Sequence, residues 1–302
     1  MKDMDSSFSE DQLQSYSDAE LSQHIDASPS FNGSRLLLLS SDLLVKTYRI
    51  SELEDTIKAM DVARQLGICT PSIKRVTANQ ENAYCIMERV QGVTLEDAWP
   101  TLSWFITIKL ALQLRGFVKR LRYVTSSTAG SLATGECRSF WLDDCYGLPA
   151  SSNSENIACF LRFWAKFTSI PKAIQAAAQG GAMDSKGQRT LPTSKTFVFT
   201  HHDLAPRNLL LTLSGELCLL DWDFAGFYPV YFEYASMQNF IMPQAWSLLA
   251  RLRWYLFSWV AVGRYQRSAA VLERVRWKFT RFPVGRRFEL LKNGGPSRYP
   301  VS

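Results

Sequence analysis

The sequence lacks several patterns that would assign a protein to a class at once. None of its six cysteines forms a C-x-x-C pair and it has only three histidines, so it offers no zinc or thioredoxin-type motif. Its most apolar late stretch, Trp254–Gly263, is far shorter than the ~20 residues of a membrane-spanning helix. The first residues are polar and acidic, unlike a secretory signal. We therefore expect a cytoplasmic protein without a transmembrane segment, whose cysteines are reduced and mostly buried.

Acidic residues are scarce at the end of the chain. Residues 251–302 hold twelve Lys or Arg but only Glu273 and Glu289, whereas residues 1–30 hold seven Asp or Glu and one Lys. Such a basic region suits nucleic acid, a membrane, a nucleotide's phosphates or a solvated helix face. Because no nucleic-acid motif accompanies the charge, we favour the last two and expect no nucleic-acid partner.

The pattern of apolar residues predicts two lobes. Residues 1–30 are polar, with one short helix from Asp18 to Ile25, and we expect them to bury little. Residues 31–90 predict two strand pairs with a helix between them, in the order β-β-α-β-β. Residues 91–302 are mostly helical and include a long helix over 158–178, with short strands between 197 and 220. The fold class is therefore α+β, with a small β-rich N-lobe and a larger, mostly helical C-lobe.

The residues that predict chemistry lie between 200 and 226. Thr200–Asn208 contains the pattern H-x-D-x-x-x-x-N, and an apolar strand followed by Asp221 comes next. In phosphoryl transfer, an Asp in this position accepts the proton of a hydroxyl, and an Asn and a second Asp hold Mg²⁺ against the nucleotide. We therefore predict Asp203 as the catalytic base in loop 200–208. Asn208 and Asp221 are the predicted metal ligands, the latter in segment 219–226.

Lys46 stands alone among apolar residues of a predicted strand. Burying a lysine there would destabilise the fold unless an opposite charge pairs with it. Nucleotide phosphates together with a helix glutamate would supply that charge. Glu54 is the first candidate for that glutamate and Glu52 the second, because each belongs to the first turns of the following helix. The sequence does not decide between them.

The pair His202-Asp203 has one alternative interpretation, a metal-dependent phosphohydrolase. That chemistry needs further histidines to complete the metal site. The third histidine, His24, belongs to the acidic N-terminal segment, and we reject this alternative.

Residues 31–300 resemble the aminoglycoside phosphotransferase/choline kinase branch of the protein kinase-like fold, and most of all its large fungal group. The likeness rests on four segments in order, which are Val45-Lys46, Ile86–Leu95, Val198–Leu210 and Leu220–Tyr234. The resemblance implies a two-lobed kinase-like fold with residues 31–90 and 91–302 as its lobes. It also implies that Ile86–Leu95 is the hinge, where backbone groups of Glu88 and Val90 hold the base of ATP or GTP.

The sequence departs from the family pattern at two places. No G-x-G-x-x-G precedes Lys46, and the bulky His202 stands where the family usually has a small residue. Protein kinases have H-R-D here, with an Arg that receives activation-loop phosphate, and His202 replaces that Arg. The run from Asp221 to Glu233 is also short for a regulated activation loop.

We therefore predict a kinase that transfers the γ-phosphate of ATP, bound with Mg²⁺, to a hydroxyl of a small molecule. Glu233 is predicted to brace the catalytic loop by hydrogen bonds. The alternative is a catalytically silent kinase-like module that binds a nucleotide or a protein, since a fold does not guarantee its function.

Overall fold

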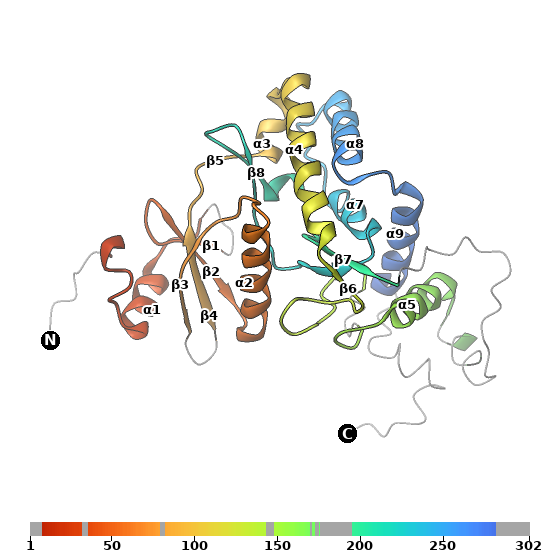
Figure 1. Ribbon diagram of the computed structural model, residues 1–302, viewed down its shortest axis with the longest axis horizontal. Helices are drawn as coiled ribbons and strands as arrows, with labels where there is room; N and C mark the ends of the chain where they lie inside the picture. Colours follow the sequence, from red (N-terminus) through yellow and green to blue (C-terminus); the bar gives the residue numbers. More distant parts are fainter. Residues whose placement is uncertain are drawn as a thin grey trace. The chain divides into compact units, whose positions relative to one another are not determined.

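The computed structural model describes residues 8–31, 36–78, 82–142, 148–169, 171–172, 175 and 195–281. The chain divides into two compact units (Figure 1). The first unit comprises Met1–Ala98 and Pro206–Asp223, and the second comprises Trp99–Ala205 and Phe224–Ser302. A segment from the middle of the chain thus joins the N-terminal residues in one unit.

A four-stranded antiparallel sheet forms the centre of the first unit, in the order β1-β2-β4-β3 (Figure 1). Its strands are β1 (Leu36–Leu38), β2 (Leu43–Tyr48), β3 (Ile73–Ala78) and β4 (Ala83–Glu88). The two inner strands are the most buried, and Val45, Cys85 and Ile86 are fully enclosed. The predicted strand pairs are therefore present, and Lys46 lies on an inner strand opposite Cys85.

Two helices accompany this sheet, α1 (Asp18–Ala27) and α2 (Ile50–Gln65). Helix α1 begins with a capping box in which Ser17 and Glu20 bond each other's backbone. The expectation that residues 1–30 bury little was wrong, because Leu21 and Ile25 are fully buried in one cluster with sheet residues. These two residues are four positions apart, so they form a narrow apolar face that the polar composition hides.

A second, three-stranded sheet brings the middle of the chain into the first unit. It has the order β5-β8-β9, with β5 (Gly92–Thr94), β8 (Leu209–Thr212) and β9 (Leu217–Leu219). The short helix α3 (Leu95–Ala98) follows β5, and the 3₁₀ turn η3 (Pro206–Asn208) precedes β8. The strands approach so closely that a Cβ at Gly92 would lie 2.4 Å from the carbonyl oxygen of Leu211. Only glycine fits there.

The second unit is mostly helical. Its helices are α4 (Trp104–Tyr123), α5 (Ser154–Lys166), α7 (Tyr231–Met237), α8 (Leu248–Val262) and α9 (Gln266–Arg281). A small sheet in the order β10-β7-β6 joins β10 (Gly226–Tyr228), β7 (Phe197–Thr200) and β6 (Thr125–Ser126). Side chains of Ser103, Asn153 and Ser247 accept backbone hydrogen bonds at the starts of α4, α5 and α8.

The predicted helix over 158–178 was wrong in its bounds. Helix α5 begins at Ser154, ends at Lys166 and is followed by Phe167 as its C-cap. The described residues 167–169 that follow α5 are not helical. Residues 170, 173–174 and 176–178 of the predicted helix lie outside the described residues.

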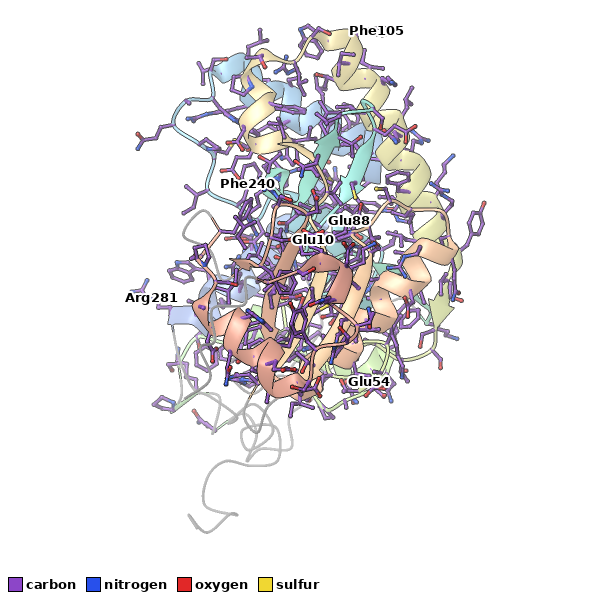
Figure 2. All side chains as sticks on the ribbon, turned by 90° about the vertical axis from the view of Figure 1, so that its left-hand side faces the viewer. Glu10, Glu54, Glu88, Phe105, Phe240 and Arg281 are labelled. Carbon is purple, nitrogen blue, oxygen red and sulfur yellow. The ribbon has the colours of Figure 1, made fainter. Side chains whose placement is uncertain are left out.

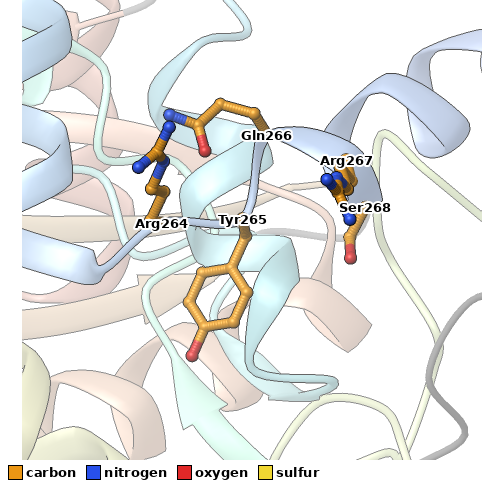
Figure 3. Close-up of a pocket in the computed structure, with 5 residues that line it drawn as sticks. All are labelled: Arg264, Tyr265, Gln266, Arg267 and Ser268. Atoms are coloured by element: carbon orange, nitrogen blue, oxygen red, sulfur yellow. The ribbon is translucent and has the colours of Figure 1, made fainter.

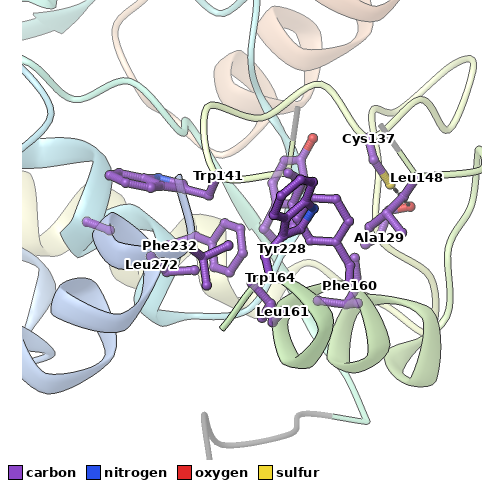
Figure 4. Packing of buried hydrophobic residues seen from close by; sticks show 14 of the residues in the cluster. Ala129, Cys137, Trp141, Leu148, Phe160, Leu161, Trp164, Tyr228, Phe232 and Leu272 are labelled. Atoms are coloured by element: carbon purple, nitrogen blue, oxygen red, sulfur yellow. Dashed lines mark hydrogen bonds between the residues drawn. The ribbon is translucent and has the colours of Figure 1, made fainter. Parts of the chain in front are cut away.

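Aromatic side chains fill the interior of the second unit. One cluster contains Trp141, Trp164, Tyr228 and Phe232 (Figure 4). A second aromatic group surrounds Trp99, which stacks on Trp246 and meets the edges of Trp254 and Phe257. Burial of such rings contributes much of the stability of a core.

The predicted α+β class is confirmed, with a small sheet-containing unit and a larger, mostly helical one. In the described part of the chain, no helix is both long and apolar enough to cross a membrane. All five described cysteines are free thiols, and Cys85, Cys137 and Cys218 are buried.

Two glycines of the second unit provide a matched test of this packing. Gly116 lies inside α4 with nothing within 4 Å of an added Cβ, whereas Gly130 has φ +131° and its Cβ would lie 2.0 Å from the carbonyl oxygen of Gly135. We expect Gly116→Ala to raise the free energy of unfolding by about 0.5–1 kcal/mol. We expect Gly130→Ala to lower it by at least about 2 kcal/mol. Urea denaturation measures both values, and equal effects of the two substitutions would contradict the described turn at Gly130.

Candidate active site

Lys46 is the centre of a charged cluster in the first unit. Its Nζ lies 2.6 Å from Oδ1 of Asp221 and 2.6 Å from Oδ2 of Asp223, and its side chain is only 13% exposed. The hydroxyl of Tyr48, two residues along β2, donates to Oδ1 of Asp223 at 3.0 Å. A strand lysine and two carboxylates about 175 residues later in the chain therefore form one network.

The charges in this cluster depend on one another. Burial disfavours the charged form of Lys46, but Asp221 and Asp223 outweigh it, so the pKa of the lysine is raised. Burial and the charge of Asp221 raise the pKa of Asp223, although Lys46 opposes this shift. Burial and Asp223 also raise the pKa of Tyr48, which stays a neutral hydrogen-bond donor. Two carboxylates thus share a single ammonium group.

The hairpin of β8 and β9 positions Asn208 and Asp221 together. Leu209 pairs with Leu219, and the N–H of Leu220 donates to the carbonyl oxygen of Asn208 at 2.9 Å. This register places Asn208 and Asp221 at the same end of the hairpin. Strand pairing fixes which residues of a hairpin lie opposite each other. The number of residues between Asn208 and Asp221 therefore brings their backbones close together.

Asp221 has a backbone conformation that few residues other than glycine, Asn and Asp adopt. Its φ is +64°, in the left-handed region that side chains other than glycine, Asn and Asp rarely adopt. Such a conformation costs about 1–3 kcal/mol and is concentrated at functional sites. The conformation directs the carboxylate towards Lys46, with which it forms the ion pair.

The donor set of this cluster fits Mg²⁺. Carboxylate and amide oxygens are the protein ligands that Mg²⁺ accepts, and it needs only one or two carboxylates besides phosphates and water. Asp221 is 37% exposed and has a second oxygen besides the one bound to Lys46. A divalent cation would also relieve the repulsion that raises the pKa of Asp223. No group of three His, Cys, Asp or Glu suited to a metal occurs among the described residues.

The predicted hinge follows β4. The N–H of Glu88 donates to the carbonyl oxygen of Ser72 at 2.9 Å, and the N–H of Arg89 donates to that of Asp42 at 2.8 Å. The N–H of Val90 has no acceptor among the described residues. Glu88 can therefore offer a carbonyl and Val90 an N–H, which is the donor and acceptor pair that the edge of a purine needs.

Glu54, the first predicted partner of Lys46, is not brought to the lysine in this structure. Its side chain is 64% exposed on α2 and pairs with Lys58 at 3.0 Å (Figure 2). The acidic residue of α2 that is buried is Asp55, at 2% exposure. Helical spacing was the signal for it, because Asp55 lies four residues before Ala59 and eight before Ala63, which are both buried.

The second unit holds the loop that contains Asp203. The backbone N–H groups of His201 and His202 donate to the two carboxylate oxygens of Glu233, at 2.9 and 3.0 Å. Asp203 itself is 2% exposed, and its N–H donates to Nδ1 of His201 at 3.3 Å. The hydrogen bonds predicted for Glu233 are therefore present, and they fix the backbone directly before Asp203.

Glu233 is fully enclosed, and this changes its acidity. Burial raises the pKa of its carboxyl to about 7, although the N–H groups of His202 and His201 and the nearby Arg122 favour the ionised form. The carboxyl is therefore partly protonated near neutral pH.

His202, the departure from the family pattern, is a structural residue of this loop. Its Nε2 lies 2.7 Å from the hydroxyl of Ser139, and its ring stacks on Tyr228 with centroids 4.4 Å apart. Its backbone has φ +68°. Burial and the neighbouring His201 lower its pKa to about 3, so it is neutral at pH 7. The imidazole thus fills the aromatic core of the second unit where a small residue would leave space.

A surface hollow of about 600 Å³ lies at the start of α9 (Figure 3). It is lined by Arg264, Tyr265, Gln266, Arg267 and Ser268. None of these is a predicted site residue, and the lining includes no carboxylate. The hollow therefore offers no carboxylate to a metal ion or to a reacting hydroxyl.

The opposite pKa shifts of Glu233 and His202 make a prediction about stability and pH. The pKa of Glu233 is raised in the folded state, so its stabilising contribution is lost as pH rises from about 4.5 to 7. The pKa of His202 is lowered, so its contribution is lost as pH falls from about 6.5 to 3. We expect the free energy of unfolding of Glu233→Gln to rise more steeply with pH between 4.5 and 7 than that of the wild type, by up to about 3 kcal/mol.

The matched variant is His202→Asn, because Asn tolerates a positive φ. We expect its free energy of unfolding to depend less on pH below 6.5 than that of the wild type. This change in slope is opposite to the one expected for Glu233→Gln. Urea denaturation across pH 4.5–7.5 measures both slopes. If both variants kept the wild-type slope, the described environments of the two side chains would be wrong.

A comparison with protein families finds a match in the second half of the chain. Residues 165–267 match the model of the phosphotransferase enzyme family. This segment contains Asp203, Asn208, Asp221 and Glu233. No curated protein is similar enough to count as a relative.

The comparison with solved structures finds aminoglycoside phosphotransferases of low sequence identity. An aminoglycoside-3′-phosphotransferase of type VIII is 16% identical, with 85% of this chain and 99% of that chain covered and a TM-score of 0.47. The gentamicin complex of APH(2″)-IIa is 14% identical, with 92% and 94% covered and a TM-score of 0.48. APH(3″)-Id of Streptomyces rimosus, solved with ADP and streptomycin, is 13% identical, with 78% and 87% covered and a TM-score of 0.43.

The evidence for the family is thus the match of the central segment, and it covers the loop, the metal-ligand candidates and the bracing glutamate. The resemblance found in the sequence is confirmed: through residues 165–267 this chain matches the phosphotransferase enzyme family.

Proposed function

We propose that this protein transfers the γ-phosphate of a nucleoside triphosphate to a hydroxyl of a small molecule. Asp203 accepts the proton of the acceptor hydroxyl, and Lys46 binds the phosphates of the nucleotide. Asn208 and Asp221 hold Mg²⁺, which neutralises charge on the phosphates when it is bound. Backbone groups of Glu88 and Val90 bind the base of ATP or GTP.

The observation that carries this proposal is the pairing of Lys46 with Asp221. A lysine on an inner strand and a carboxylate at the end of the β8–β9 hairpin are far apart in the sequence, yet their charged atoms are 2.6 Å apart. Phosphoryl transfer needs this combination, because an ammonium and a metal-binding carboxylate must act on the same phosphates. The family match over the same hairpin supports the assignment.

A small molecule is the better acceptor than a protein. After Asp223 the chain forms β10 and then α7, which begins at Tyr231. This leaves no room for the activation loop that protein kinases use to regulate the site and bind a peptide. His202, which replaces the regulatory Arg, is buried and neutral, so it cannot receive a phosphate group.

The second candidate is a silent module that binds a nucleotide without turnover. The chain has a lysine, a base, an amide and a carboxylate in the required order, and this favours an enzyme. The two candidates differ in their need for the metal, because turnover requires Mg²⁺ at the phosphates and simple binding does not.

Thermal stability with nucleotide tests the metal ligands. At a concentration of about 100 times the dissociation constant, ATP with Mg²⁺ should raise the midpoint of unfolding by about 3–6 °C. We expect Asp221→Asn to lose the part of this rise that depends on Mg²⁺. Asn is the right substitution because it tolerates the φ of +64° at this position.

Asp26→Asn is the control, since Asp26 is exposed on α1, and it should respond like the wild type. Differential scanning fluorimetry with Mg²⁺ or with EDTA separates the outcomes. A rise that is the same with and without metal in the wild type would favour the silent module.

Turnover tests the base. Slow hydrolysis of ATP, with water as the acceptor, should fall by about 100-fold or more in Asp203→Asn, because a general base contributes this much. The thermal shift with ATP and Mg²⁺ should remain, which shows that the variant is folded and binds. Phosphate release measures the rate, and an unchanged rate would remove Asp203 from the mechanism. A screen of hydroxyl metabolites with the wild type then identifies the acceptor.

A further inference from the structure

Helix α8 has apolar side chains on its exposed face as well as on its buried face. One face is buried in the second unit and contains Trp254, Phe257 and Ala261. The opposite face carries seven exposed apolar side chains, which we call the α8 stripe: Leu248, Leu249, Leu252, Tyr255, Leu256, Trp259 and Val260. A surface helix normally has polar and charged residues on its outer face. The α8 stripe therefore has the composition of an interface.

The spacing of the α8 stripe is that of a helix which packs on another helix. Leu249, Leu252, Leu256 and Trp259 follow one another at intervals of three, four and three residues. This is the heptad pattern of two seam positions, which turns every member towards the same partner helix. A stripe of this regularity fits one straight helix better than it fits an irregular groove.

The apolar surface is as large as a dimer interface needs. Helix α4 packs along α8 (Figure 1) and has four exposed apolar side chains of its own, Trp104, Phe105, Ile108 and Leu112. The guanidinium carbon of Arg253 on α8 lies 5.9 Å from the ring centre of Trp104, which joins the two helices at this end.

Counting ~200 Å² for each aromatic and ~100 Å² for each aliphatic side chain when fully exposed, the two helices expose about 800 Å² of apolar surface. Stable interfaces bury ~800 Å² on each partner, whereas the largest patch on a typical monomer is ~300–600 Å².

We propose that the α8 stripe, together with the exposed apolar side chains of α4, is the contact surface with a second copy of this chain that is related to the first by a two-fold axis. Such an interface brings the same surface of both copies together. The stripe contains no charged residue, so self-pairing sets no like charges against each other. Membrane-surface helices instead carry Lys and Arg on the face opposite the apolar one, and in α8 that face is buried around Trp254.

The test is the oligomeric state of the full chain in solution. Sedimentation equilibrium or light scattering should give the mass of two chains. The variant Leu252→Glu/Leu256→Glu should be monomeric, with a dissociation constant of the dimer raised by at least about 100-fold, because each charge would be buried without a partner. Its thermal unfolding should stay cooperative, since both side chains are exposed in the single copy, at 60% and 44%.

The control is Leu213→Glu/Ile241→Glu, which adds the same charge at two apolar positions that are 86% and 92% exposed and lie outside the stripe. It should remain dimeric. A wild type that is monomeric at every concentration, or a dimer that survives the α8 substitutions, would overturn the proposal. Flotation of a monomeric wild type with phosphatidylcholine/phosphatidylserine vesicles, abolished by the α8 substitutions, would assign the stripe to a membrane instead. None of these outcomes depends on phosphotransfer.

Discussion

The burial of one ammonium group organises the first unit. Lys46 lies on an inner strand of the sheet and is 13% exposed, so its charge must be compensated or the strand would be unstable. Asp221 and Asp223 supply that compensation. This ties the β8–β9 hairpin, which comes from the middle of the chain, to the N-terminal sheet. The same ion pair that stabilises the unit holds a cation proposed to bind phosphate beside a carboxylate proposed to bind a metal ion.

In the second unit, the buried loop that contains Asp203 has to be supported. Two backbone N–H groups before Asp203 would lack acceptors inside a dry core, and Glu233 accepts both of them. Burying the carboxylate of Glu233 lowers the stability of the folded state near neutral pH, because burial raises the pKa of this group to about 7. His202 contributes to the same loop by packing rather than by charge, since its ring is neutral and lies among aromatic side chains. The loop is thus held by a carboxylate and an imidazole, and burial shifts the pKa of each of them.

These observations separate the residues of the phosphotransferase pattern into two kinds. Asp203, Asn208 and Asp221 are proposed to act chemically, because each can offer an oxygen to a proton or a metal. Glu233 and His202 act on the backbone and on the core, and the bulky ring of His202 fills space in that core beside the proposed base. The apolar outer face of α8 is independent of both groups and is explained by association.

The sequence by itself determined the class of the fold and the chemistry of the proposed site. Strand alternation, helical spacing and the H-x-D-x-x-x-x-N pattern are local, so they predicted the sheet, the hairpin and the roles proposed for Asp203, Asn208 and Asp221. The hydrogen bonds that Glu233 accepts were also predicted, because Glu233 belongs to the segment Leu220–Tyr234 that resembles the family.

Only the tertiary structure decided which charges meet. It paired Lys46 with Asp221 and Asp223 while Glu54 pairs with Lys58, and it buried Leu21 and Ile25 of a segment that looked polar. It also left one face of α8 exposed, although that helix has apolar side chains on both of its faces. The reason is the same in each case: periodicity specifies which residues share a face, but the partner of that face is set by contacts between segments that are distant in the chain.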